Sequence, residues 1–90
     1  MSTPETRQLP PATFSSFITS VAASAMSSMG NGPGATEDLQ MARHTIDILG
    51  VLKEKTAGNL DEEEQKLLET LLYETRMQFV QKAGTGAADD

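Results

Sequence analysis

TEDLQMARHTIDILGVLKEKTAGNLDEEEQKLLETLLYETRMQFVQK, residues 36–82, contains two apolar patterns that are separated by one short turn. In both halves the apolar residues recur every three or four positions, which is the spacing of an amphipathic helix. Gly58 and Asn59, which tolerate the backbone that ends a helix, lie between the halves. A connection this short predicts that the two helices form an antiparallel hairpin.

The first of these helices is predicted to start after Thr36, as its N-cap, and to run to about Thr56. Glu37 and Asp38 follow the cap and suit the positive end of the helix. Apolar positions cover nearly half of the circumference: Leu39, Met41, Ala42, Ile46, Ile48, Leu49 and Leu52. Because one contacting helix requires a narrower stripe, we expect this helix to contact two neighbours.

The second helix is predicted over about residues 62–82, and Asp61 and Glu64 have the spacing of a capping box at its start. One apolar stripe is expected to face the hairpin partner: Leu67, Leu68, Leu71, Leu72, Thr75 and Phe79. Tyr73, Met77 and Val80 form a second stripe on a different side. Two explanations remain for its cover, an N-terminal helix of the same chain, which we favour, or a second subunit.

An N-terminal helix is predicted over residues 14–29, with Thr13 as its N-cap and Gly30 as its stop. One arc of this helix is apolar, and the opposite arc consists of Ser, Thr and Ala. No charged residue occurs between Gln8 and Thr36. The small-residue face is either solvated or suited to the close approach of another helix.

These elements place a single three-helix domain at residues 13–82, between disordered tails at residues 1–12 and 83–90. The predicted fold class is all-α, with the antiparallel hairpin and an amphipathic N-terminal helix. Three helices cannot easily bury all of the apolar surfaces at once, and domains of this size often depend on a partner subunit. We therefore expect the chain to assemble as a helical-bundle dimer.

The composition argues against several classes of function. The formal net charge is −6 and the seven basic residues are scattered, whereas nucleic-acid binding requires clustered cations. The chain has no cysteine, which excludes disulfides, thiolate metal sites and thiol catalysis. It also lacks a secretory signal and any long apolar stretch. We expect a cytoplasmic protein with no nucleic-acid or membrane partner.

Residues that could support chemistry are few. His44 is the single histidine, and with Asp47 it makes only a two-residue set, too small for a metal or catalytic site. No phosphate loop, nucleophile elbow or cofactor motif is present, so we predict no catalytic, cofactor or metal site. Arg43 and Asp47 have the spacing of an intrahelical ion pair, and Arg76 is expected to reach them across the hairpin. Asp47→Asn should then lower stability modestly.

The segment from Asp38 to Val80 resembles DUF1844, a family of small bacterial proteins of unknown function. The turn Lys55-Thr56-x-Gly58-Asn59-Leu60 is a fairly specific element of the resemblance, and the N-terminal helix from Phe14 to Gly30 fits as well. The other positions that carry the resemblance are Asp38-Leu39, Ala42-Arg43, Ile46-Asp47, Leu49, Leu52, Glu63-Glu64, Leu67-Leu68, Leu71-Leu72-Tyr73, Arg76 and Val80. The resemblance implies no activity.

Two hypotheses of function follow. The favoured one is a non-enzymatic, homodimeric protein–protein interaction module, whose candidate interface is Phe17, Val21, Ser24, Tyr73, Met77 and Val80. In this view Lys55, Thr56, Gly58 and Asn59 form a structural turn in which Gly58 has a positive φ. The alternative is a small-molecule or enzymatic role that uses a polar cluster of Arg43, Asp47, Lys55 and Asn59. A concave pocket around these residues would favour the alternative, and a flat helix surface would not.

Overall fold

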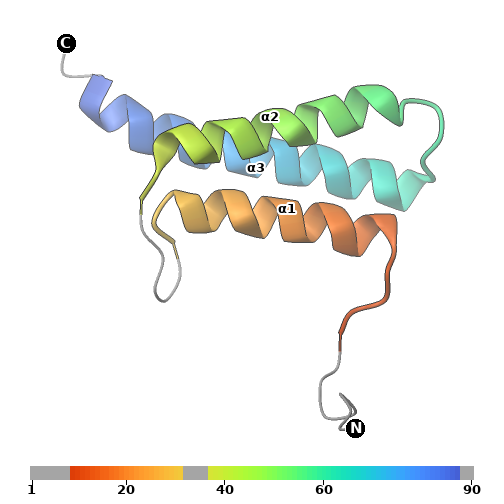
Figure 1. The fold of residues 1–90 in the computed structure, drawn as a ribbon. Helices are drawn as coiled ribbons and strands as arrows, with labels where there is room; N and C mark the ends of the chain where they lie inside the picture. Colours follow the sequence, from red (N-terminus) through yellow and green to blue (C-terminus); the bar gives the residue numbers. More distant parts are fainter. Residues whose placement is uncertain (1–8, 32–36, 88–90) are drawn as a thin grey trace, which may run out of the picture.

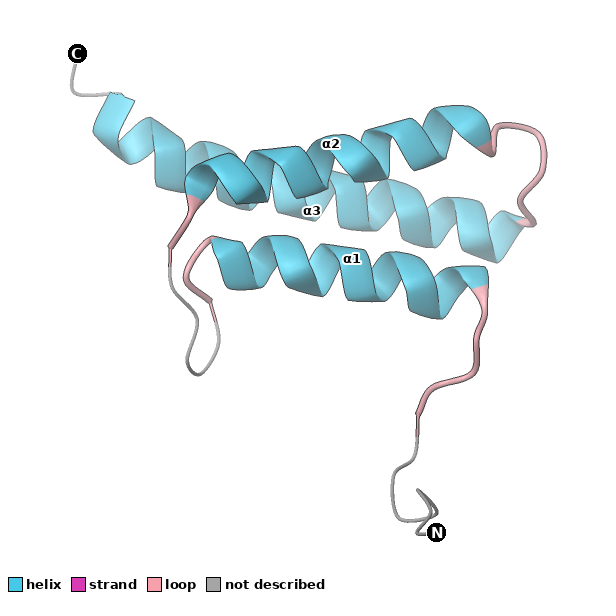
Figure 2. Cartoon of the chain, viewed as in Figure 1, coloured by secondary structure: helices cyan, strands magenta, loops and turns pink. Residues whose placement is uncertain are grey.

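A computed structural model describes residues 9–31 and 37–87. Within these residues the chain forms α1 (Phe14–Ser28), α2 (Leu39–Lys55) and α3 (Glu62–Ala87) (Figures 1 and 2). The described residues contain no strand, and their only β-type pairing is an isolated antiparallel bridge between Met29 and Glu37. The predicted all-α class is therefore confirmed.

The three helices pack side by side (Figure 1). α2 and α3 run in opposite directions on either side of the turn at residues 56–61, and α1 packs against both of them. α2 thus contacts two neighbouring helices, as its broad apolar arc predicts. The sequence does not decide whether the N-terminal helix packs against its own chain or against another subunit. In the structure α1 packs against α2 and α3 of the same chain.

All three helices contribute to one core. Its buried apolar members are Ile18, Ala22, Ala25, Met29, Ala42, Ile46, Leu49, Leu68 and Leu72. Alanines make up three of these positions, in α1 and α2, and small side chains at a helix contact allow a short distance between axes. Each larger aliphatic side chain that is removed from water stabilises the fold by roughly 2 kcal/mol.

Side-chain caps explain where the helices begin. Thr13 caps α1 as predicted, because its hydroxyl accepts a hydrogen bond from the Ser16 amide at 3.0 Å. The predicted capping box of α3 is also confirmed. Asp61 Oδ1 accepts from the Glu64 amide at 2.7 Å, and Glu64 Oε1 accepts from the Asp61 amide at 3.0 Å. These reciprocal bonds satisfy amides that have no partner inside the helix.

Two predicted boundaries differ from the structure. α2 begins at Leu39, and its N-cap is Asp38, whose carboxylate accepts from the Met41 amide at 3.1 Å. Thr36, the predicted cap, lies outside the described residues, and the helix starts after it because the Asp38 carboxylate satisfies the first-turn amide. α3 continues to Ala87, past the predicted end at Lys82, since residues 83–87 contain no proline and each added residue gains one backbone bond. The rest of the predicted C-terminal tail, and most of the N-terminal one, lie outside the described residues.

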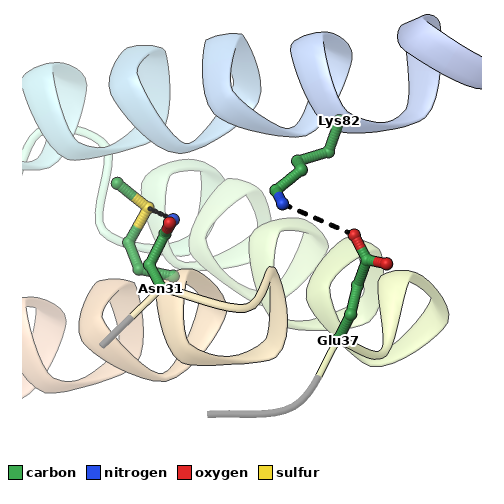
Figure 3. Close-up of polar contacts among 4 residues, drawn as sticks. Asn31, Glu37 and Lys82 are labelled. Carbon is green, nitrogen blue, oxygen red and sulfur yellow. Dashed lines mark hydrogen bonds and ion pairs between the residues drawn. The ribbon is translucent and has the colours of Figure 1, made fainter. Parts of the chain in front are cut away.

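The end of α1, the start of α2 and the C-terminal half of α3 meet at one end of the bundle. The Asp38 amide donates to the Ser28 carbonyl at 2.6 Å, which ties the start of α2 to the end of α1. Lys82 of α3 forms an ion pair with Glu37, with 3.6 Å between Nζ and Oε2 (Figure 3). The side-chain Nδ2 of Asn31 donates a hydrogen bond to the Met26 sulfur at 4.0 Å, and Figure 3 also draws this contact. Both ion-pair partners are exposed, so this pair adds about 1 kcal/mol at most.

Across residues 9–31 and 37–87, every helix falls short of the length and apolar content that a membrane crossing requires.

Candidate functional site

The α3 stripe, defined as Tyr73, Met77 and Val80, is open to solvent. The exposed fractions of the three residues are 65%, 43% and 60%. The favoured explanation for this stripe, that the N-terminal helix covers it, is wrong. α1 packs instead against the side of α3 that carries Leu68 and Leu72, because the apolar arc of α1 completes the core there. Nothing else within the described residues covers the stripe.

The predicted interface residues of α1 differ in accessibility. Phe17 is half exposed and Ser24 is exposed, so both are accessible to a partner. Val21 is partly buried and packs against the core. The Ser/Thr face of α1 is largely solvated, and two of its hydroxyls, those of Thr19 and Ser20, donate to backbone carbonyls one turn earlier.

A third exposed apolar group, on α2, was missed by sequence reasoning. Met41, Ile48 and Val51 are exposed although α2 contacts both other helices. Their spacing places them in one row with His44, which is also exposed. The wide apolar arc of α2 is the available signal, and contacts with two neighbouring helices account for only part of it.

The predicted polar cluster is dispersed. Arg43 and Asp47 are exposed on α2, and no ion pair or hydrogen bond in the described part of the chain joins either of them to Arg76. The Arg76 guanidinium lies beside Gly50, with Nη2 3.4 Å from the position that a Cβ on Gly50 would occupy. Gly50 is almost one turn beyond Asp47, so Arg76 reaches a part of α2 nearer to the turn than the prediction assumed.

Two hollows adjoin Arg76. One, of about 200 Å³, is lined by Lys53, Glu69, Leu72, Tyr73, Arg76, Met77 and Val80. The other, of about 380 Å³, is lined by Gly50, Lys53, Glu54, Ala57, Leu72 and Arg76. The lining of the first hollow includes the whole α3 stripe and three charged residues, Lys53, Glu69 and Arg76. The candidate site is therefore an apolar helix surface with charged residues beside it.

No group of three or more His, Cys, Asp or Glu side chains in residues 9–31 and 37–87 is arranged to hold a metal ion.

A family model described as "Domain of unknown function (DUF1844)" matches residues 11–81. The chain belongs to the DUF1844 family. The resemblance seen in the sequence is thereby confirmed, and the match spans α1, α2 and most of α3. The DUF1844 description names no activity. Comparisons with curated proteins and with solved structures give no match.

Residues 55–60, which lie within the range matched by the family model, form the turn between α2 and α3. The Thr56 hydroxyl donates to the Leu52 carbonyl at 2.7 Å, and the Asn59 amide donates to the Thr56 carbonyl at 2.8 Å. Gly58 has φ +83°, as predicted, whereas Asn59 does not share the left-handed conformation. Leu60 packs against the core, so the turn also anchors the start of α3.

Gly58→Val is expected to lower the free energy of unfolding of this DUF1844 domain by about 1 kcal/mol or more. A Cβ at this position meets no atom within 4 Å, so the expected cost is that of the backbone conformation and not of a Cβ clash. Urea denaturation monitored by circular dichroism measures the difference. Gly58→Asn is the matched control and should lose less, because Asn tolerates a positive φ. Equal losses in the two variants would contradict the conformational explanation.

Because Asp47 is exposed in the structure, Asp47→Asn is expected to change the free energy of unfolding by less than about 0.5 kcal/mol, the usual range for a surface substitution. This replaces the modest loss inferred from the sequence, because Asp47 forms no ion pair with Arg43 or Arg76 in the described structure. Thermal unfolding of both proteins at one concentration measures the change. A loss above about 1 kcal/mol would restore an electrostatic role for Asp47.

Proposed function

We propose that this DUF1844 chain is a non-enzymatic protein–protein interaction module that functions as a homodimer. Its subunit is the helical hairpin of α2 and α3 together with α1. The observation that carries the proposal is the exposure of Tyr73, Met77 and Val80 on a subunit whose core is already complete. Contiguous apolar residues on a water-facing surface mark a binding surface, since burying them removes apolar area from water.

A second copy is the favoured partner. Homo-oligomers with two-fold symmetry are the commonest assemblies, because one self-complementary patch supplies both sides of the interface. The subunit is also small, and small domains gain from the additional apolar area that a dimer buries. Phe17 and Ser24 on α1 remain open and belong to the same proposal as candidate interface residues.

The enzymatic or small-molecule alternative has less support. Arg43, Asp47 and Lys55 are exposed on the convex surface of α2, and Asn59 is exposed in the turn that follows it. Binding pockets usually bury most of a ligand in a concave site. We further propose a cytoplasmic location, which the absence of cysteine supports. We also propose that the chain has no nucleic-acid or membrane partner, on the basis of the net charge of −6 and the scattered basic residues.

Sedimentation velocity over a micromolar dilution series tests the dimer. We expect a species of twice the 9.6 kDa chain mass that dissociates on dilution. Because dimerisation and folding are linked, the melting temperature should rise with protein concentration. A single 9.6 kDa species at every concentration, with a constant melting temperature, would overturn the proposal.

A further inference from the structure

The exposed side of α3 has the residue spacing of a helix–helix seam. Thr70, Tyr73, Met77 and Val80 are all exposed and follow one another at intervals of three, four and three residues. Steps of three and four residues add up to a seven-residue repeat. This repeat keeps the row on the side of α3 that would face a partner helix lying along it. The row is thus suited to pair with a helix that runs alongside α3.

Two opposite charges lie along one edge of this row. Glu69 and Arg76 immediately precede Thr70 and Met77, and both are exposed. Seven residues of helix separate them by about 10 Å along the axis, too far for an ion pair within α3. Glu69 accepts one hydrogen bond, from Gln65 at 3.2 Å, and neither residue is in an ion pair within the described chain. Both charges remain available to a partner.

The two charges are self-complementary in only one relative direction. In a parallel two-fold pair, the edge that carries Glu69 and Arg76 faces the opposite edge of the second copy, so the two charges do not meet each other. If a second α3 crosses antiparallel about a point near Tyr73, Glu69 of each copy faces Arg76 of the other, because both residues lie about equally far from the centre. Tyr73 of each copy then lies against Tyr73 and Met77 of the second copy.

We infer that the α3 stripe binds the α3 stripe of a second copy of this chain in the antiparallel direction, with two reciprocal Glu69–Arg76 ion pairs beside the two-fold axis. This inference rests on the proposed homodimer and specifies its interface. Arg76 is well placed for this role, since its guanidinium lies beside the uncharged backbone of Gly50 and lines the same hollow as the stripe.

Charge reversal tests the ion pairs. Arg76→Glu should raise the dissociation constant of the dimer about tenfold at low salt, because each Glu69 then faces a like charge. The double variant Glu69→Arg/Arg76→Glu exchanges the two charges and should restore the constant to within about threefold of the parent. Both positions are exposed, so far-ultraviolet circular dichroism should show the same helix content in all variants. The difference should shrink in 1 M salt.

Single cysteines test the direction, and the absence of native cysteine makes every disulfide attributable. Tyr73 lies near the proposed two-fold axis, so the variant Tyr73→Cys should form a disulfide-linked dimer on mild oxidation. Lys66 is also exposed, but the variant Lys66→Cys should not form a disulfide, because antiparallel pairing separates the two copies of this position by about 20 Å along the helix axis. Parallel pairing would cross-link both variants alike.

The outcomes separate this inference from the proposed function. The antiparallel α3 interface is overturned if Arg76→Glu leaves the dissociation constant of the dimer unchanged, or if Lys66→Cys cross-links as readily as Tyr73→Cys. Either result leaves the proposed homodimer intact. A parent protein that sediments as a monomer overturns both.

Discussion

Leu49→Ala is expected to lower the free energy of unfolding by about 3 kcal/mol, the typical cost of a buried leucine-to-alanine change. Leu49 is fully buried in the middle of α2, within the core that all three helices share. Removing its branched end leaves a cavity that neighbouring helices fill only partly. In a domain of this size such a loss is a large part of the total stability.

Chemical denaturation followed by circular dichroism measures the effect, with parent and variant at one protein concentration because dimerisation contributes to apparent stability. Glu54→Ala, at an exposed position of the same helix, is the control and should change stability by less than about 0.5 kcal/mol. If Leu49→Ala unfolds at the same denaturant concentration as this control, then α2 does not supply the core as described.

Ile18→Ala is expected to destabilise the whole domain by a similar amount, about 3 kcal/mol. Ile18 is fully buried, and it lies in the same core cluster as Leu49 and Leu68. α1 is therefore an integral part of the bundle, and its loss of packing should weaken α2 and α3 as well. We expect one cooperative unfolding transition that moves to lower denaturant concentration without splitting.

Hydrogen exchange resolves the effect helix by helix. Amides of α1, α2 and α3 should lose protection together in Ile18→Ala, because the three helices share one core. Thr19→Ala, at the exposed neighbouring position, should leave protection nearly unchanged. Loss of protection confined to α1 would contradict the prediction and would identify α1 as an independently attached arm.

The candidate site could be predicted only in part. The spacing of Tyr73, Met77 and Val80, at four and three residues, is sufficient to place this group on one side of a helix. Its exposure could not be inferred, because the sequence is also compatible with cover by α1. The Met41, Ile48 and Val51 row was missed for the same reason, since periodicity shows that residues share a side of a helix but not what lies opposite.

The sequence by itself determined where α1 and α3 begin and where the chain turns. Thr13, the Asp61–Glu64 pair and Gly58 act through hydrogen bonds and backbone conformations that span only a few residues, so local chemistry is sufficient. Only the tertiary structure decided how each helix is rotated about its axis. That rotation depends on packing between residues far apart in the chain, and it leaves Tyr73 in solvent and places Arg76 beside Gly50.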